Sequence, residues 1–202
     1  MNKKTFAALL VLLAAGAALL LRSRADPLDA RRFVGGLPAL TPDMRLTVAR
    51  LDSTITAQAE DPKVAWGLDW GTTKAALTTP VRVHYAIDLS GEAPVEFRRD
   101  PKTRLVTAVF RDPEVLAVEV FSRDKRAVVQ PGWGRLAVFS GQALVDRLDE
   151  EQYDAAKAEG ASPRALAQVR SLARPELAGL VADFLRRGGA QAPVAILFRS
   201  DP

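Results

Sequence analysis

The stretch VRVHYAIDL at residues 81–89 alternates between two sets of side chains. Successive side chains of a β-strand point to opposite faces of a sheet, so the Val, Tyr, Ile and Leu residues of this stretch share one face. Arg82, His84, Ala86 and Asp88 share the other face. An apolar face backed by a mostly polar one predicts a strand that is buried on one side only, which is typical of antiparallel sheets.

The residues before this strand continue the β pattern. RLTVARLDSTITA at 45–57 has the same period of two and predicts a long strand, followed by a turn at 60–63 and a loop or hairpin at 65–74. A strand is also predicted at 75–79, and Pro80 after it marks an edge position or a bulge, because proline has no N–H to donate. Five shorter strands are predicted downstream, at 95–98, 104–111, 114–121, 127–129 and 136–139.

The hydrophobic period changes near residue 140 from that of a strand to that of a helix. Residues 142–159 predict one helix, and residues 163–187 predict a second, in which Pro175 predicts a kink or a restart. VAILF at 194–198 predicts a final, buried strand. The expected helix caps and stops are Ser140, Gly160, Ser162 with Pro163, and Gly188 with Gly189.

Strands that come first and helices that come late indicate an α+β fold. We expect a mainly antiparallel β-sheet covered on one face by two C-terminal helices, with a closing C-terminal strand and an N-terminal transmembrane helix. Residues 1–24 form the membrane anchor or a signal peptide, residues 25–43 a linker rich in proline and glycine, and residues 44–202 the globular α+β domain.

The N-terminal segment has two interpretations. Residues 5–21 carry no charge, and this length just reaches the lower limit of about 17 apolar residues for a membrane-spanning helix. Lys3 and Lys4 before the segment favour a cytoplasmic N-terminus and an extracytoplasmic domain in a single-pass membrane protein. Alternatively, Ala15-Gly16-Ala17 is a cleavage site, and the domain is exported after removal of a signal peptide.

Composition excludes several classes of function. The chain has 28 basic and 24 acidic residues, and the whole excess of four basic residues lies in 1–24, so the rest of the chain is formally neutral. A nucleic-acid binder is therefore not expected. The short arginine pairs are interpreted as solvated surface; they are Arg31-Arg32, Arg98-Arg99 and Arg186-Arg187. With no cysteine and one histidine, the chain excludes cysteine metal sites and two-histidine sites, and no cofactor is expected.

Four features of the chain resemble a bacterial family catalogued as a domain of unknown function, number 4230. They are the N-terminal hydrophobic segment, Ala-Ile-Asp-Leu-Ser at 86–90, Pro-Glu-Val-Leu-Ala-Val at 113–118, and an alanine-rich helical tail ending in a strand at 164–198. The family usually has glycine where this chain has Ala86. The resemblance covers residues 45–198 and implies a membrane-anchored domain with no established catalytic residues. A weaker likeness, to the band-7/stomatin domain, is one of architecture alone.

Candidate site residues are few. Within the family signature Ile87-Asp88-Leu89-Ser90, we expect the Asp88 carboxylate to cap a turn. His84 and Asp88 lie four residues apart, about 13 Å along a strand, so a catalytic dyad needs a partner from another strand, such as Asp52. An acidic cluster on the first helix is interpreted as a solvated face; it consists of Asp149, Glu150, Glu151 and Asp154.

Three tryptophans in glycine-rich segments, Trp66, Trp70 and Trp133, offer a possible partner surface, with plugging of the sheet ends as the alternative. The leading hypothesis is a membrane-anchored, non-catalytic binding or assembly domain at the cell envelope, with a protein partner or self-assembly. One alternative is an envelope hydrolase that uses acidic residues and His84. Another is a self-assembling membrane scaffold of the band-7 kind.

Overall fold

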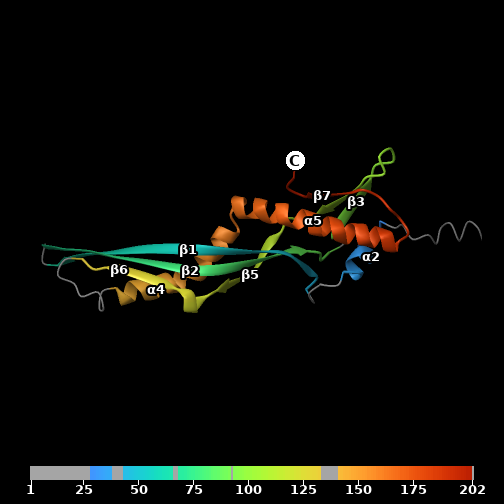
Figure 1. Ribbon diagram of the computed structural model, residues 1–202. Coiled ribbons are helices and arrows are strands. Elements are labelled where there is room, and N and C mark those ends of the chain that lie inside the picture. Colours follow the sequence, from blue (N-terminus) through green and yellow to red (C-terminus); the bar gives the residue numbers. More distant parts are fainter. Residues whose placement is uncertain (1–27, 38–42, 66–67, 92, 133–140, 202) are drawn as a thin grey trace, which may run out of the picture.

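The computed structural model describes residues 28–37, 43–65, 68–91, 93–132 and 141–201. The molecule is elongated: a long β-hairpin with one C-terminal helix beside it extends to one end, and a body with the other C-terminal helix and short strands lies at the other end (Figure 1). Its elements, in chain order, are α2 (Ala30–Gly35), β1 (Arg45–Ala65), β2 (Leu68–Asp88), β3 (Val95–Arg99), β4 (Val106–Phe110), β5 (Glu114–Val120), the 3₁₀ turn η1 (Ser122–Asp124), β6 (Arg126–Gln130), α4 (Gln142–Gly160), α5 (Pro163–Arg187) and β7 (Val194–Phe198). The predicted α+β class is confirmed.

The hairpin is longer than the sequence suggests. β1 and β2 each have 21 residues and pair antiparallel along nearly their whole length. The turn predicted at 60–63 is wrong, because these residues continue β1. Of the two alternatives predicted for 65–74, the hairpin is confirmed and the loop is wrong, because β2 begins at Leu68 and pairs back onto β1. Pro62 is tolerated because the ladder shifts register between Pro62 and Val64.

Pro80 lies inside β2 and does not end a strand. On one side of β2, β6 pairs with residues 74–78 and β5 with residues 81–86, so Pro80 faces the gap between them. The Pro80 carbonyl accepts the Phe121 N–H at 3.0 Å, which shows that its backbone polar groups point into this gap and away from β1. The missing N–H therefore removes no bond from the β1–β2 ladder.

The single sheet expected from the sequence is in fact two. β1, β2, β5 and β6 form a four-stranded sheet, and β3, β4 and β7 form a separate three-stranded sheet. β3 and β4 pair antiparallel, whereas the C-terminal β7 pairs parallel with β4. The strand predicted at 194–198 is present as β7, but it belongs to the second sheet.

Both C-terminal helices form as the sequence predicts. α4 packs on β1 and β2, and α5 packs on β1 and β7. α4 ends at Gly160, and the Ser162 hydroxyl accepts the Ala165 N–H at 3.3 Å, which caps α5. The restart predicted at Pro175 does not occur, because α5 runs through this residue to Arg187. The predicted cap Ser140 lies outside the described residues.

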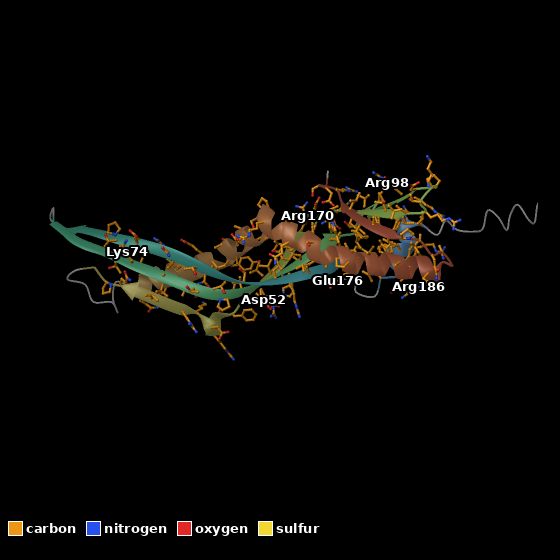
Figure 2. All side chains as sticks on the ribbon, turned by 45° about the horizontal axis from the view of Figure 1, so that its top comes forward. Asp52, Lys74, Arg98, Arg170, Glu176 and Arg186 are labelled. Carbon is orange, nitrogen blue, oxygen red and sulfur yellow. The ribbon has the colours of Figure 1, made fainter. Side chains whose placement is uncertain are left out.

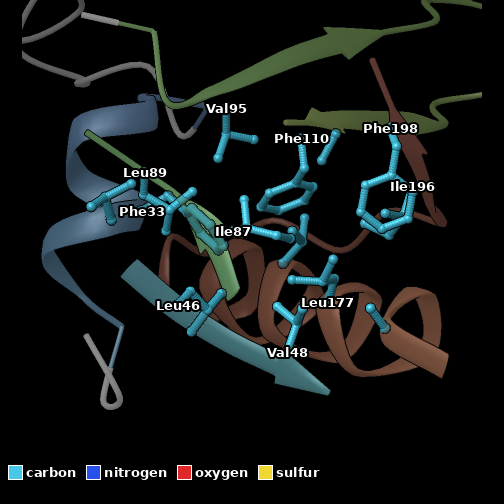
Figure 3. Close-up of a cluster of buried hydrophobic side chains, with 14 of the residues drawn as sticks. Phe33, Leu46, Val48, Ile87, Leu89, Val95, Phe110, Leu177, Ile196 and Phe198 are labelled. Carbon is cyan, nitrogen blue, oxygen red and sulfur yellow. The ribbon is translucent and has the colours of Figure 1, made fainter. Parts of the chain in front are cut away.

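The main core lies between the base of the hairpin, the second sheet, α2 and α5 (Figure 3). The apolar face predicted for 81–89 is the buried face, since Tyr85 and Ile87 are at most 1% exposed. Phe33 of α2 is 1% exposed, so residues 28–37, which the sequence assigns to the linker, pack as part of the body. A smaller cluster lies between α4 and the outer half of the hairpin; it consists of Ala59, Ala75, Leu77, Leu144 and Leu148.

Among the described residues, the structure has no helix that is both long enough and apolar enough to cross a membrane. Residues 5–21, the predicted anchor, lie outside the described residues, as does the strand predicted at 136–139.

Candidate functional site

The outer edge of β1 is an open sheet edge among the described strands. β1 is the terminal strand of its sheet, and no other described strand pairs with its far side. Figure 1 shows β1 along the margin of the hairpin for most of its length. An exposed strand edge presents unpaired N–H and C=O groups and is a template for pairing with another chain.

The contacts of Pro80 show which β1 residues present their backbone to this edge. Pro80 is the partner of Thr54 in the β1–β2 register, and its polar groups point away from β1. Thr54 therefore forms a non-hydrogen-bonded pair with Pro80 and directs its own N–H and C=O toward the open edge. The register has no shift between residues 50 and 60, so the even-numbered residues of this range all do the same. We name residues 50–60 the β1 edge.

The β1 edge lacks the devices that usually block edge-to-edge pairing. It contains no lysine, no proline and no register shift. Its two acidic residues are paired from β2: Asp52 Oδ1 lies 2.6 Å from Arg82 Nε, and Glu60 Oε1 lies 2.8 Å from Lys74 Nζ. Figure 2 labels Asp52 and Lys74 along the hairpin. The edge can therefore accept a further strand without a buried, unpaired acid.

A polar ladder crosses the outer face of the same sheet. Arg82 holds Asp52 with two hydrogen bonds and lies 5.4 Å from the centroid of the Phe121 ring. The hydrogen bond from Arg82 holds the pKa of Asp52 below its usual range. His84 Nε2 lies 3.0 Å from Glu119 Oε1 on β5. The His84–Asp52 dyad considered above is therefore absent, because each side chain has another partner.

Asp88 has the geometry of an Asx turn at the end of β2. Its Oδ1 accepts the Ser90 N–H at 2.8 Å, and its Oδ2 accepts a hydrogen bond from Arg111 Nη1 at 2.6 Å. Hydrogen bonds from Ser90, with the nearby Arg111 guanidinium, hold the pKa of Asp88 below its usual range. Ile87 and Leu89, on either side, are at most 1% exposed and belong to the main core. The signature therefore combines a turn after β2, formed by Asp88 and Ser90, with two side chains of the main core, Ile87 and Leu89.

The other candidate residues named from the sequence do not come together. Trp66 and Trp133 lie outside the described residues, as does the side chain of Trp70, whose backbone belongs to β2. In the acidic cluster, Asp149 pairs with Lys125, which lies between η1 and β6, and Glu151 pairs with Arg147 of its own helix. Glu150 and Asp154 are exposed. Within the described residues, no group of three or more potential metal ligands occurs.

Comparisons with known proteins do not identify a family for the chain. No family model, curated protein or solved structure matches the chain.

The β1 edge was not predicted from the sequence, although residues 45–57 were correctly predicted as a strand. Whether a strand lies at an edge depends on the order of strands in the sheet, which the sequence does not give directly. The one sequence signal was the regular alternation of this segment, which contains no lysine and no proline.

Proposed function

We propose that this protein is a membrane-tethered assembly domain that pairs with a second copy of itself through the β1 edge. The observation that carries the proposal is the open edge at residues 50–60 of β1, where the register is regular and neither proline nor lysine occurs. Strand addition to an open edge gives affinity through main-chain hydrogen bonds and specificity through side chains. A two-fold dimer satisfies this surface with itself.

Charge selects one register for the pair. When two β1 edges meet antiparallel about an axis at Ile55, Arg50 lies opposite Glu60 of the second copy, and Thr54 lies opposite Thr56. An axis at Thr56 would set Asp52 against Glu60, which repel each other, and an axis at Thr54 would leave Arg50 opposite Gln58. Cross-strand pairs of opposite charge and of threonines are favourable. Arg50 makes no ion pair within the described part of the chain, so its charge is available to Glu60.

Backbone geometry agrees with this register. The residues that point their N–H and C=O groups to the edge are the even-numbered ones, and in this register they meet one another. Each such pair exchanges two hydrogen bonds, which gives about a dozen between residues 50 and 60. Ile55 then forms a non-hydrogen-bonded pair with itself, in which the two Cα atoms lie about 4.5 Å apart.

Disulfide trapping tests the register, because the chain has no cysteine of its own. The full-length variant Ile55→Cys in membranes should form a disulfide-linked dimer under mild oxidation, since the expected Cα separation suits a disulfide. Ala57→Cys alone should not, because its partner is Ser53 of the second copy. The double variant Ser53→Cys/Ala57→Cys should cross-link again. Equal yields for Ile55→Cys and Ala57→Cys would contradict the register, and no dimer in any variant would contradict the assembly.

The tether and the sidedness belong to the same proposal. Residues 5–21 would hold the chain in the membrane, with the N-terminus cytoplasmic and the domain outside. The resemblance of residues 45–198 to the uncharacterised family supports an anchored domain at the envelope, and the band-7 likeness supports self-assembly. The hydrolase alternative has less support, because Asp52 and Asp88 are bound to arginines and neither contacts His84.

A further inference from the structure

The three arginine pairs of the sequence converge at one end of the molecule. Arg31 and Arg32 lie on α2, Arg98 and Arg99 at the end of β3, and Arg186 and Arg187 in the last turn of α5. Figure 2 labels Arg98 and Arg186 at the same end, opposite to the hairpin tip. We name these six residues the arginine end.

Three phenylalanines hold the arginine pairs together. Phe33, Phe97 and Phe184 come from α2, β3 and α5, and each lies within two residues of one pair. The Phe33 ring centroid lies 5.7 Å from that of Phe97 and 5.3 Å from that of Phe184. The Phe97 and Phe184 centroids lie 6.3 Å apart. A packed aromatic cluster of this kind fixes the three elements, so the convergence is a property of the fold.

The arginine end has more positive side chains than nearby acids neutralise. Nearby acids engage two of its members, Arg98 with Glu96 and Arg186 with Asp183. The acid closest to α2, Asp29, accepts the Arg31 N–H as a helix cap. Within the described residues, the side chains of the other four members take part in no ion pair; they are Arg31, Arg32, Arg99 and Arg187.

A hollow of about 330 Å³ opens between two of these four arginines. Arg32 and Arg187 line it together with apolar residues of α2 and α5, among them Phe33, Leu180 and Phe184. The one acidic residue in the lining, Asp183, is already paired with Arg186. An apolar wall beside two guanidinium groups suits a ligand that joins an anionic group to hydrocarbon. A phospholipid has this composition, whereas the sugar–phosphate chain of a nucleic acid does not.

Chain connectivity places this end close to the predicted anchor. Only residues 22–29 separate the end of the hydrophobic run from α2, and eight residues span at most roughly 28 Å. A segment in the membrane would therefore hold α2 near the lipid surface. At that distance, basic side chains are attracted to anionic headgroups.

We propose that the arginine end binds the headgroups of anionic phospholipids and holds the body of the domain against the membrane. The inference rests on the tether described under the proposed function, but it concerns a second, separate contact with the bilayer. Bidentate pairing of guanidinium groups with phosphate would supply the recognition.

A single label can report this contact. Gln191 is exposed and lies four residues after Arg187, so the full-length variant Gln191→Cys can carry a fluorophore that a headgroup-bound quencher reaches only at the bilayer surface. Vesicles of phosphatidylcholine alone are compared with vesicles of phosphatidylcholine and phosphatidylglycerol in equal parts. We expect severalfold more quenching in the anionic vesicles, and the difference should shrink as salt is added.

Two matched variants decide the assignment. Neutralising Arg31, Arg32, Arg99 and Arg187 to glutamine should abolish the extra quenching, whereas neutralising four distant arginines, Arg123, Arg126, Arg147 and Arg164, should preserve it. Equal quenching in both lipids, or an equal loss in both variants, overturns the proposal. Displacement of the label from anionic vesicles by added DNA would assign the surface to nucleic acid and also overturn it. Flotation with vesicles of phosphatidylcholine alone separates this result from failure of the tether, in which the protein does not float with these vesicles.

Discussion

Gly160 is a residue at which α4 packs tightly against the hairpin. A Cβ atom there would lie 2.9 Å from Val83 Cγ1 and 3.2 Å from Tyr85 Oη, and the Gly160 carbonyl accepts the Tyr85 hydroxyl at 3.0 Å. Gly160→Ala should therefore destabilise the fold by about 1–3 kcal/mol through overpacking. Urea unfolding followed by circular dichroism measures the change.

Gly179 provides the matched control on the other helix. No atom lies within 4 Å of a Cβ built at Gly179 in α5. Gly179→Ala should stabilise the protein by about 0.5–1 kcal/mol, because glycine in a helix interior is less favourable than alanine. If both substitutions changed the free energy of unfolding in the same direction, the close approach at Gly160 would not be the cause.

Asp88 should contribute to the acid sensitivity of the fold. Hydrogen bonds from Ser90 hold its pKa below the unfolded value of about 3.9, so its contribution to stability is present above that pH. The contribution is lost as the pH falls through the lower, folded pKa. In Asp88→Asn, thermal stability should fall less steeply below about pH 4 than in the parent protein, with a lower melting temperature at neutral pH. If the melting temperatures of the two proteins fell equally with pH, this role of Asp88 would be ruled out.

At the scale of elements, proline substitutions can disturb the β1 edge and the β1–β2 ladder one at a time. Thr54 directs its N–H to the open edge, so Thr54→Pro should leave the hairpin folded and abolish disulfide trapping through Ile55→Cys. Ile55 directs its N–H toward Thr79 of β2, so Ile55→Pro should destabilise the fold on the order of 1–3 kcal/mol. Thermal unfolding and cross-linking yield are measured together, and trapping that survives Thr54→Pro would contradict strand pairing.

The type of each element could be predicted from the sequence, but its limits depended on the neighbours. Period-two patterns and caps identified the base of the hairpin and both helices, because these signals are local. At three prolines, the sequence predicted a break in a strand or helix that does not occur. Pro62 lies at a register shift, Pro80 faces a gap between two strands, and Pro175 lies on an exposed part of α5. Pro62 and Pro80 are tolerated for reasons that exist only in the assembled structure, whereas α5 continues through Pro175 despite the backbone hydrogen bond that a proline inside a helix loses.

At the scale of the whole molecule, the candidate surfaces were harder to foresee than the fold. Arg31-Arg32, Arg98-Arg99 and Arg186-Arg187 each resemble ordinary surface when considered alone. Their convergence depends on Phe33, Phe97 and Phe184, which meet only when α2, β3 and α5 pack. The β1 edge likewise exists only because β5 and β6 both pair on the other side of β2.

The two proposed surfaces together constrain how a dimer lies on a membrane. In an antiparallel β1–β1 pair, the two-fold axis passes through Ile55 perpendicular to the sheet, and the bodies lie at opposite ends. If both chains are anchored in one bilayer, that axis must run along the membrane normal. The hairpins would then lie along the surface, with an arginine end in contact with lipid at each extremity.

Spin labels on opposite halves of β1 test this arrangement in the full-length protein. Thr47 lies eight residues from the axis and Gln58 three, so a rise of about 3.3 Å per residue gives distances between copies of roughly 50 Å for Thr47→Cys and roughly 20 Å for Gln58→Cys. Parallel pairing in register would instead give short distances at both positions. Pulsed electron paramagnetic resonance in reconstituted bilayers measures both, and Thr54→Pro should remove both distances. A long distance at Gln58 or a short one at Thr47 would show that the chains meet in another way.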